Sequence, residues 1–279
     1  MQVIYGWMEA LLPFSWIQFD FMKNALLAVL IITPLFGILG TMIVNNRMAF
    51  FSDALGHSAL TGIAVGILFG AGDTNLAMIA FGIVFALVLN RLKARQTQNT
   101  DTIISVCSSL SVALGLAILS RGGNFSKYSG LLVGDILSIT AREILYLLAV
   151  LLVTAVFWLC CFNKLNAVSI NRSLANSRGI SVTRMDNLFA VLTACIVMLS
   201  IKWVGLMIIN ALLILPVASA RNLSVNMREY HFFSVLFSMF SGILGLIVSF
   251  YVNVATGPTI VIISAVIYFA TYLYKKICH

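Results

Sequence analysis

The sequence predicts an all-α integral membrane protein that crosses the bilayer about eight or nine times. Of its 279 residues, 61% are hydrophobic and 9% are charged, whereas soluble domains carry about 25% charged residues. A spanning helix needs about 20 mostly apolar residues to cross a hydrocarbon core of roughly 30 Å, and several such stretches follow one another along the chain. We therefore expect one transmembrane domain over residues 1–279 and no soluble domain.

Nine apolar stretches are candidates for membrane spans. They cover residues 24–44, 54–71, 74–90, 103–119, 143–162, 187–201, 203–220, 231–250 and 257–274. Two of them are short and contain glycine. Eight full spans with one partial or re-entrant element fit equally well, since non-helical backbone survives at membrane depth where it lines a protein cavity.

The net charge of +8 indicates membrane topology. Lys and Arg lie between the apolar stretches and form no stripe interleaved with aromatic residues, so nucleic acid is not an expected partner. If the segment that holds Arg47 is cytoplasmic, alternation assigns 12 of the 17 Lys and Arg to that side, where basic residues are retained during insertion. The C-terminus is then cytoplasmic. The N-terminus lies outside unless residues 1–16 add an interfacial or re-entrant element.

The longest polar stretch covers residues 162–187 and contains four basic residues and one acidic residue. On the cytoplasmic side, a helix ending at Gly179 is suited to dock onto another protein; a solvated connector without a partner is the alternative. The chain contains no GxxxxGK[ST] loop for binding phosphate. If ATP drives this protein, another chain must therefore hydrolyse it.

Asp53 and His57 are the candidate metal ligands. Their i, i+4 spacing places a carboxylate and an imidazole on one helix face, where both can converge on one ion. Burying a charge near the bilayer centre costs about 2.5 to 3.5 kcal/mol, so ionisable residues there usually face a cavity or pathway. Asp and His suit zinc, manganese or iron(II), whereas copper(I) favours Cys and Met. The alternative is that Asp53 caps a helix at the membrane surface with His57 as its hydrogen-bonded neighbour.

Two further segments contain polar or helix-breaking residues that we consider structural or gating candidates. The first segment contains Gly205, Asn210 and Pro216. The second contains Asn253, Gly257 and Pro258. Pro216 frees a carbonyl one turn earlier and can bend a moving span, and a static kink accommodated by packing is the alternative. Gly257-Pro258 is expected to open the last helix, since proline is common in a first turn.

Five segments, in order along nearly the whole chain, resemble the ABC permease family that imports zinc, manganese or iron. The family's Arg-Met and Asp-Ala-x-Ser-His pattern is similar to RMAFFSDALGHSALTG, its Phe-Gly-x-Ile-Leu segment to LLVGDILSIT, and its Ala-x-x-x-Gly-Ile cytoplasmic loop to SLANSRGI. Its Val-Gly-x-Leu-Leu-x-x-Ala-Leu-Leu-x-x-Pro-Ala-Ala-x-Ala stretch is similar to VGLMIINALLILPVASAR, and its closing segment to NVATGPTIVI.

The resemblance implies a permease subunit of the bacterial cytoplasmic membrane that works by alternating access. It implies a second permease copy, two cytoplasmic ATPase subunits and an extracytoplasmic metal-binding protein as partners. No bound cofactor is expected apart from the transported ion, and ATP acts only through the partner subunits. Asp53 and His57 would line the metal route. The loop at about 163–186 would couple to the ATPase through Leu174, Ala175, Ser177, Arg178, Gly179 and Ile180.

Three positions depart from the family pattern. Gly56 stands where the family often has Ser, Thr61 where Pro is frequent, and Asn253 where many members have Asp. Two alternative functions remain at this point: a secondary, gradient-driven transporter, and an ABC permease for a chelate such as haem, a siderophore or cobalamin. An intramembrane enzyme is disfavoured, because no second His or acidic cluster lies at catalytic spacing.

Overall fold

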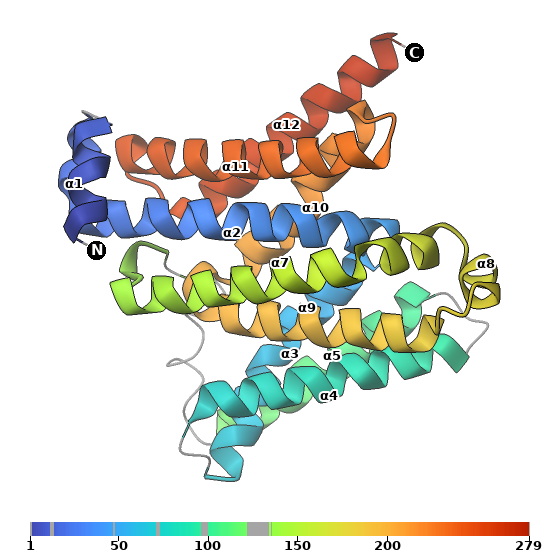
Figure 1. The fold of residues 1–279 in the computed structure, drawn as a ribbon. Helices are drawn as coiled ribbons and strands as arrows, with labels where there is room; N and C mark the ends of the chain where they lie inside the picture. The colour runs from blue at the N-terminus through green and yellow to red at the C-terminus, as the bar shows by residue number, and fades with distance from the viewer. Residues whose placement is uncertain are drawn as a thin grey trace. The chain divides into compact units, whose positions relative to one another are not determined.

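The computed structural model describes residues 2–11, 14–46, 48–70, 73–95, 100–121, 134 and 136–278. Nearly all of these residues are helical, and none of them forms a strand. Within these ranges, eight helices are long and apolar enough to cross a membrane. The predicted all-α, multi-pass fold is therefore confirmed (Figure 1).

The helices of membrane-spanning length follow the predicted order. They are α2 (Asp20–Asn45), α3 (Ala49–Leu68), α4 (Thr74–Arg95), α5 (Thr100–Arg121), α7 (Ala141–Ile170), α9 (Val182–Val204), α11 (Met227–Val252) and α12 (Thr256–Cys278). The shorter elements are α1 (Gln2–Leu11), η1 (Ser15–Gln18), η2 (Ile136–Ser138), α8 (Arg172–Ser177) and α10 (Leu206–Leu223). The ninth candidate span, 203–220, corresponds to α10, which is shorter than the eight. Eight full spans with one shorter element is therefore the better description.

Contacts divide the chain into two compact units. The α2–α11 unit comprises Met1–Val44, Val133–Val156 and Trp203–His279. The α3–α5 unit comprises Asn45–Leu132 and Phe157–Lys202, so the boundary between the units falls within α7.

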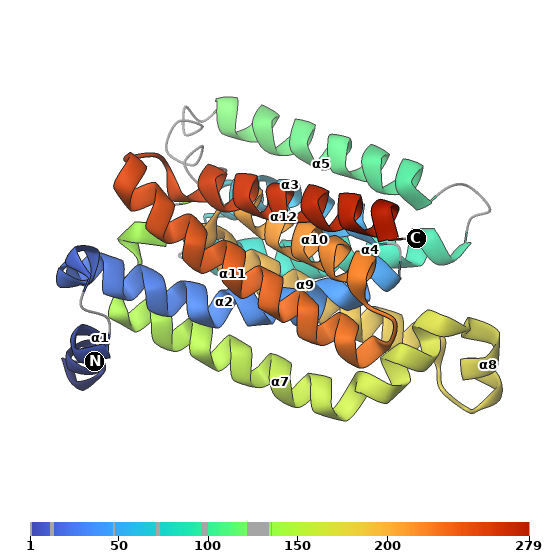
Figure 2. The same cartoon turned by 90° about the horizontal axis from the view of Figure 1, so that it is seen from above.

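Small residues let α2 and α11 approach closely in the α2–α11 unit. Ser234 and Ser238 donate hydrogen bonds of 2.7 and 2.8 Å to the backbone carbonyls of Gly37 and Thr33. A Cβ on Gly37 would lie 2.9 Å from the Cα of Val235. Interfaces of Gly and Ser are typical of helices that associate in membranes, and the two helices lie side by side in both views (Figures 1 and 2).

In the α3–α5 unit, α3 is held by α5 and by α4. Thr61 donates a hydrogen bond to the carbonyl of Ser111 on α5, and the Ser111 hydroxyl donates one of 3.1 Å back to the Thr61 hydroxyl. A Cβ on Gly115 would lie 3.0 Å from the Thr61 backbone, and one on Gly62 would lie 2.8 Å from the Cα of Met78 on α4. Thr61, which departs from the family's proline, thus fixes α3 against α5.

A single glycine separates α9 from α10. Gly205 has φ +81, a backbone conformation that favours glycine, and a Cβ on Gly134 would lie 2.3 Å from its nitrogen. Asn210 and Pro216 both lie inside α10. Their roles in gating stay a prediction.

The connection from α11 to α12 is short. Asn253 ends α11 in the left-handed conformation, with φ 56, which asparagine tolerates better than most residues. Gly257 and Pro258 lie in the first turn of α12, so the expectation that they open the last helix is confirmed.

Replacing Gly40 of α2 with alanine is expected to destabilise the α2–α11 unit. The new Cβ would lie 2.3 Å from the carbonyl oxygen of Leu213 on α10, and overpacking of this kind costs about 1–3 kcal/mol. Thermal unfolding of the detergent-solubilised protein measures the effect. Gly6→Ala is the control, because a Cβ there meets nothing within 4 Å. Equal unfolding temperatures for the two variants would contradict the close packing of α2 on α10.

Candidate metal site

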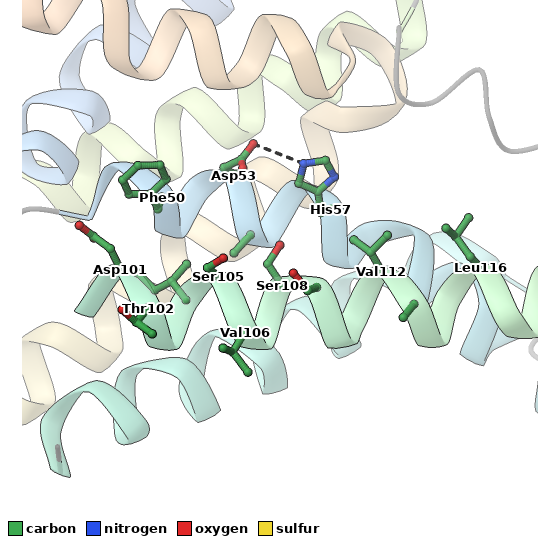
Figure 3. Close-up of a pocket in the computed structure, with 14 residues that line it drawn as sticks. Phe50, Asp53, His57, Asp101, Thr102, Ser105, Val106, Ser108, Val112 and Leu116 are labelled. Atoms are coloured by element: carbon green, nitrogen blue, oxygen red, sulfur yellow. Dashed lines mark ion pairs between the residues drawn. The ribbon is translucent and has the colours of Figure 1, made fainter. Parts of the chain in front are cut away.

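Asp53 and His57 lie one turn apart on α3, and their side chains point toward each other (Figure 3). The distance between Asp53 Oδ1 and His57 Nε2 is 3.6 Å. The helix begins at Ala49, with Met48 as its N-cap, rather than at the predicted residue 54. Both side chains therefore belong to the helix interior, and the alternative that Asp53 is a helix cap is wrong.

Both side chains line a cavity of about 930 Å³ within the α3–α5 unit. The opposite wall of this cavity belongs to α5, which contributes Asp101, Ser105 and Ser108 among its polar residues (Figure 3). The cavity thus combines one imidazole nitrogen with carboxylate and hydroxyl oxygens, which are the donors that zinc, manganese and iron(II) accept.

The polar wall of α5 is not part of the sequence prediction. The span predicted over 103–119 starts after Asp101, which left this carboxylate in a connecting loop. The spacing of Asp101, Ser105 and Ser108, at i, i+4 and i+7, places them on one helix face. This spacing is the signal that could have found the wall.

As a candidate metal site, the Asp53–His57 pair offers few protein ligands. Among the residues that the structure describes, no group of three His, Cys, Asp or Glu side chains could hold a metal ion. Structural zinc sites are closed by four ligands. A pair that leaves most coordination positions to water or to another chain can release an ion as well as bind one.

The pair is also accessible. The side chains of His57 and Asp53 are 39% and 45% exposed, whereas their neighbours Ser52 and Ser58 are fully buried. Polar groups on a spanning helix usually face a pathway or another protein, because lipid exposure is costly. The exposed face of α3 is therefore expected to contact water or protein.

The six residues predicted to contact an ATPase lie in α8 and directly after it. The side chain of Asn171 caps the helix by accepting a hydrogen bond of 3.0 Å from the N–H of Leu174. At the other end, the N–H of Ile180 donates to the carbonyl of Ala175 at 3.1 Å, and Gly179 has φ +76. A left-handed glycine is a common way to end a helix, so the predicted end at Gly179 is confirmed.

The surface of α8 separates into a buried and an exposed side. Ala175 is buried, whereas Leu174, Ser177 and Arg178 are exposed. An exposed leucine on a short polar helix is suited to contact a partner.

Eight membrane-length helices and an accessible polar pair inside one of them are the properties of a multi-pass transport protein. The chain belongs to the ABC 3 transport family, whose model matches residues 18–275. It is therefore a membrane-spanning transport subunit of an ABC-type system.

Known proteins resemble this chain over nearly its full length. The high-affinity zinc uptake system membrane protein ZnuB of Haemophilus influenzae is 30% identical over 264 residues, which cover 93% of this chain and 99% of that protein. The manganese import system permease protein ScaB of Streptococcus gordonii is 27% identical, over 91% of each chain. The solved structure of PsaBC from Streptococcus pneumoniae in complex with Fab has a TM-score of 0.80 at 25% identity, over 98% of this chain and 95% of that one.

A cysteine at position 57 is expected to react with a membrane-impermeant thiol reagent. The His57 side chain lines the cavity, and methanethiosulfonate reagents react with thiolates in water but not with thiols in lipid. The background for the measurement is a variant in which all five native cysteines are serine. Ser58→Cys is the control, because the Ser58 side chain is fully buried. Failure to label position 57 from either side of the membrane would contradict an aqueous cavity.

Proposed function

We propose that this chain is the membrane-spanning subunit of an ATP-driven importer for a divalent transition metal ion. Zinc and manganese are the main candidates, and iron(II) is the third. The observation that carries the proposal is the Asp53–His57 pair, half-exposed in a membrane helix and open to a cavity. The zinc and manganese permeases that resemble the chain support the same class of cargo.

The chemistry of the pair favours these ions. Carboxylate and imidazole together suit divalent ions from manganese to zinc, because neither donor is as soft as a thiolate. Cys107 and Cys195, which are free thiols, do not line the cavity. A copper(I) route would require sulfur donors there.

The open coordination positions favour a second copy of the permease as a partner. An exposed Asp–His pair must be covered by protein or water in the bilayer. A second copy that faces the first with its own Asp53 and His57 would bring the number of strong ligands to four. We therefore expect a homodimer, with the two pairs on opposite sides of one metal route.

The driving force must come from other chains. Because the sequence has no phosphate-binding loop, we expect two cytoplasmic ATPase subunits that contact the exposed side of α8. The residues assigned to this coupling are Leu174, Ala175, Ser177, Arg178, Gly179 and Ile180. An extracytoplasmic metal-binding protein is expected to supply the ion. We place the chain in the bacterial inner or plasma membrane. Its Lys and Arg residues are concentrated in the segments assigned to the cytoplasm, and this distribution favours a cytoplasmic C-terminus.

The transport cycle that fits these parts is alternating access. The ion must be bound differently in the outward-open and inward-open states, because a ligand shifts an equilibrium only by its differential affinity. We assign to Asp53 and His57 the difference in ion affinity between the two states. Gly205, Asn210, Pro216, Asn253, Gly257 and Pro258 are candidates for the backbone positions that bend during the cycle.

Asp53→Ala and His57→Ala are each expected to abolish metal uptake by the permease–ATPase complex in proteoliposomes, because each removes one of the two strong ligands. The measurements are zinc, manganese and iron(II) uptake and metal-stimulated ATP hydrolysis. Both variants should remain folded and bound to the ATPase. Asp73→Asn is the control, since this side chain precedes α4, does not line the cavity, and can still accept the Asn75 N–H as an amide.

Normal metal uptake by both variants would contradict the assignment of Asp53 and His57 as metal ligands. Uptake that persists without ATP, by a chain that purifies without an ATPase, would instead favour a gradient-driven transporter. Transport of a haem, siderophore or cobalamin chelate with no response to free metal would favour a chelate permease.

A further inference from the structure

The short helix α8 is connected to α9 by an ion pair. Arg172, the first residue of α8, places Nη2 3.2 Å from Oδ2 of Asp186. The Asp186 side chain is 18% exposed, whereas that of Arg172 is 50% exposed. Removal of the arginine would leave a carboxylate without its partner in a poorly hydrated position. This loss is more costly than the loss of a fully exposed pair.

The same part of α9 is also connected to α4. The next residue of α9, Asn187, accepts a hydrogen bond of 2.5 Å from Nδ2 of Asn90, which is buried. Two consecutive residues of α9 thus connect α8 on one side with α4 on the other.

Close helix packing continues this connection to the candidate metal site. Met198 of α9 packs against Gly82 of α4, where an added Cβ would lie 2.7 Å from the methionine side chain. Met78 of α4 packs against Gly62 of α3, where an added Cβ would lie 2.8 Å from the Met78 backbone. The backbone contact at Gly62 leaves α3 and α4 little room to slide independently, and the Met198 side chain links α9 to the same helix α4.

We propose that Asp186 is a positioning residue that fixes α8 to α9 and α4, so that a displacement of α8 is transmitted to the α3 helix that carries Asp53 and His57. The inference rests on the proposed function, because it presumes that an ATPase moves α8. All the residues involved belong to the α3–α5 unit. Asp186 does not line the cavity that holds Asp53 and His57, and its role is to keep the cycle of the ATPase coupled to the metal route.

The experiment uses the complete permease–ATPase complex in proteoliposomes and measures the metal taken up per ATP hydrolysed. Asp186→Asn removes the charge while keeping the size of the side chain. We expect the ratio to fall about tenfold, a typical size for coupling between sites, while ATP hydrolysis and binding of the ATPase persist. Asp73→Asn is the matched control, because it makes the same chemical change on an exposed residue before α4, and it should leave the ratio unchanged.

A double-mutant cycle tests whether Arg172 and Asp186 act as one pair. Arg172→Ala should lower the ratio as Asp186→Asn does, and the double variant should be no worse than either single variant. Arg172→Lys keeps the charge, so its ratio of metal taken up to ATP hydrolysed should stay close to that of the wild type. Arg172 is half-exposed, so its substitution tests the same claim even if Asp186→Asn assembles poorly.

Three results would overturn the inference. The first is a wild-type ratio in Asp186→Asn or in Arg172→Ala. The second is a proportional fall of uptake and ATP hydrolysis in both Asp186→Asn and Arg172→Ala, which indicates that the pair supports assembly rather than coupling. The third is a double variant in which the two losses multiply. If the wild-type complex takes up no metal, the proposed function itself is wrong. That result differs from the three above, in which the wild type transports metal and only the role of Asp186 fails.

Discussion

The bilayer interior offers no water to polar groups, and this constraint governs every spanning helix of the chain. Hydroxyl groups in these helices mostly bond to a carbonyl one turn earlier, as Ser58 does to Leu55 and Thr193 does to Phe189. Such local bonds satisfy the hydroxyl without a partner helix. Asp53 and His57 are different, because both remain accessible beside a cavity. Anchoring in the membrane does not explain their exposure.

The residues proposed to act in transport are concentrated in one unit. The Asp53–His57 pair on α3, the polar wall of α5 and the capped helix α8 all belong to the α3–α5 unit. Within that unit, α3 is packed tightly against α4 and α5 through Gly62 and Thr61. A helix held in this way cannot adjust alone. Movement of Asp53 and His57 therefore requires movement of the neighbouring helices, which is the property that an externally driven transporter needs.

Much of the architecture could be predicted from sequence because it depends on local patterns. Hydropathy located all eight long helices, and the spacing of Asp53 and His57 predicted their approach correctly. The start of α3 was misplaced, because the polar Ser52 and Asp53 lower the local hydropathy. The contacts of Asn90 with Asn187 and of Arg172 with Asp186 could not be predicted. They join different helices, and no periodicity specifies which helix faces which.

The most direct measurement of whether Asp53 and His57 bind the transported ion is pulsed electron paramagnetic resonance of Mn²⁺ bound to the permease–ATPase complex. An imidazole ligand gives the manganese spectrum a nitrogen coupling that oxygen ligands do not. The chain has three histidines, so their contributions can be separated by substitution. The coupling should be present in the wild type and in His231→Gln, and absent in His57→Ala. A coupling that survives in His57→Ala, or bound manganese without any nitrogen coupling in the wild type, would contradict the assignment.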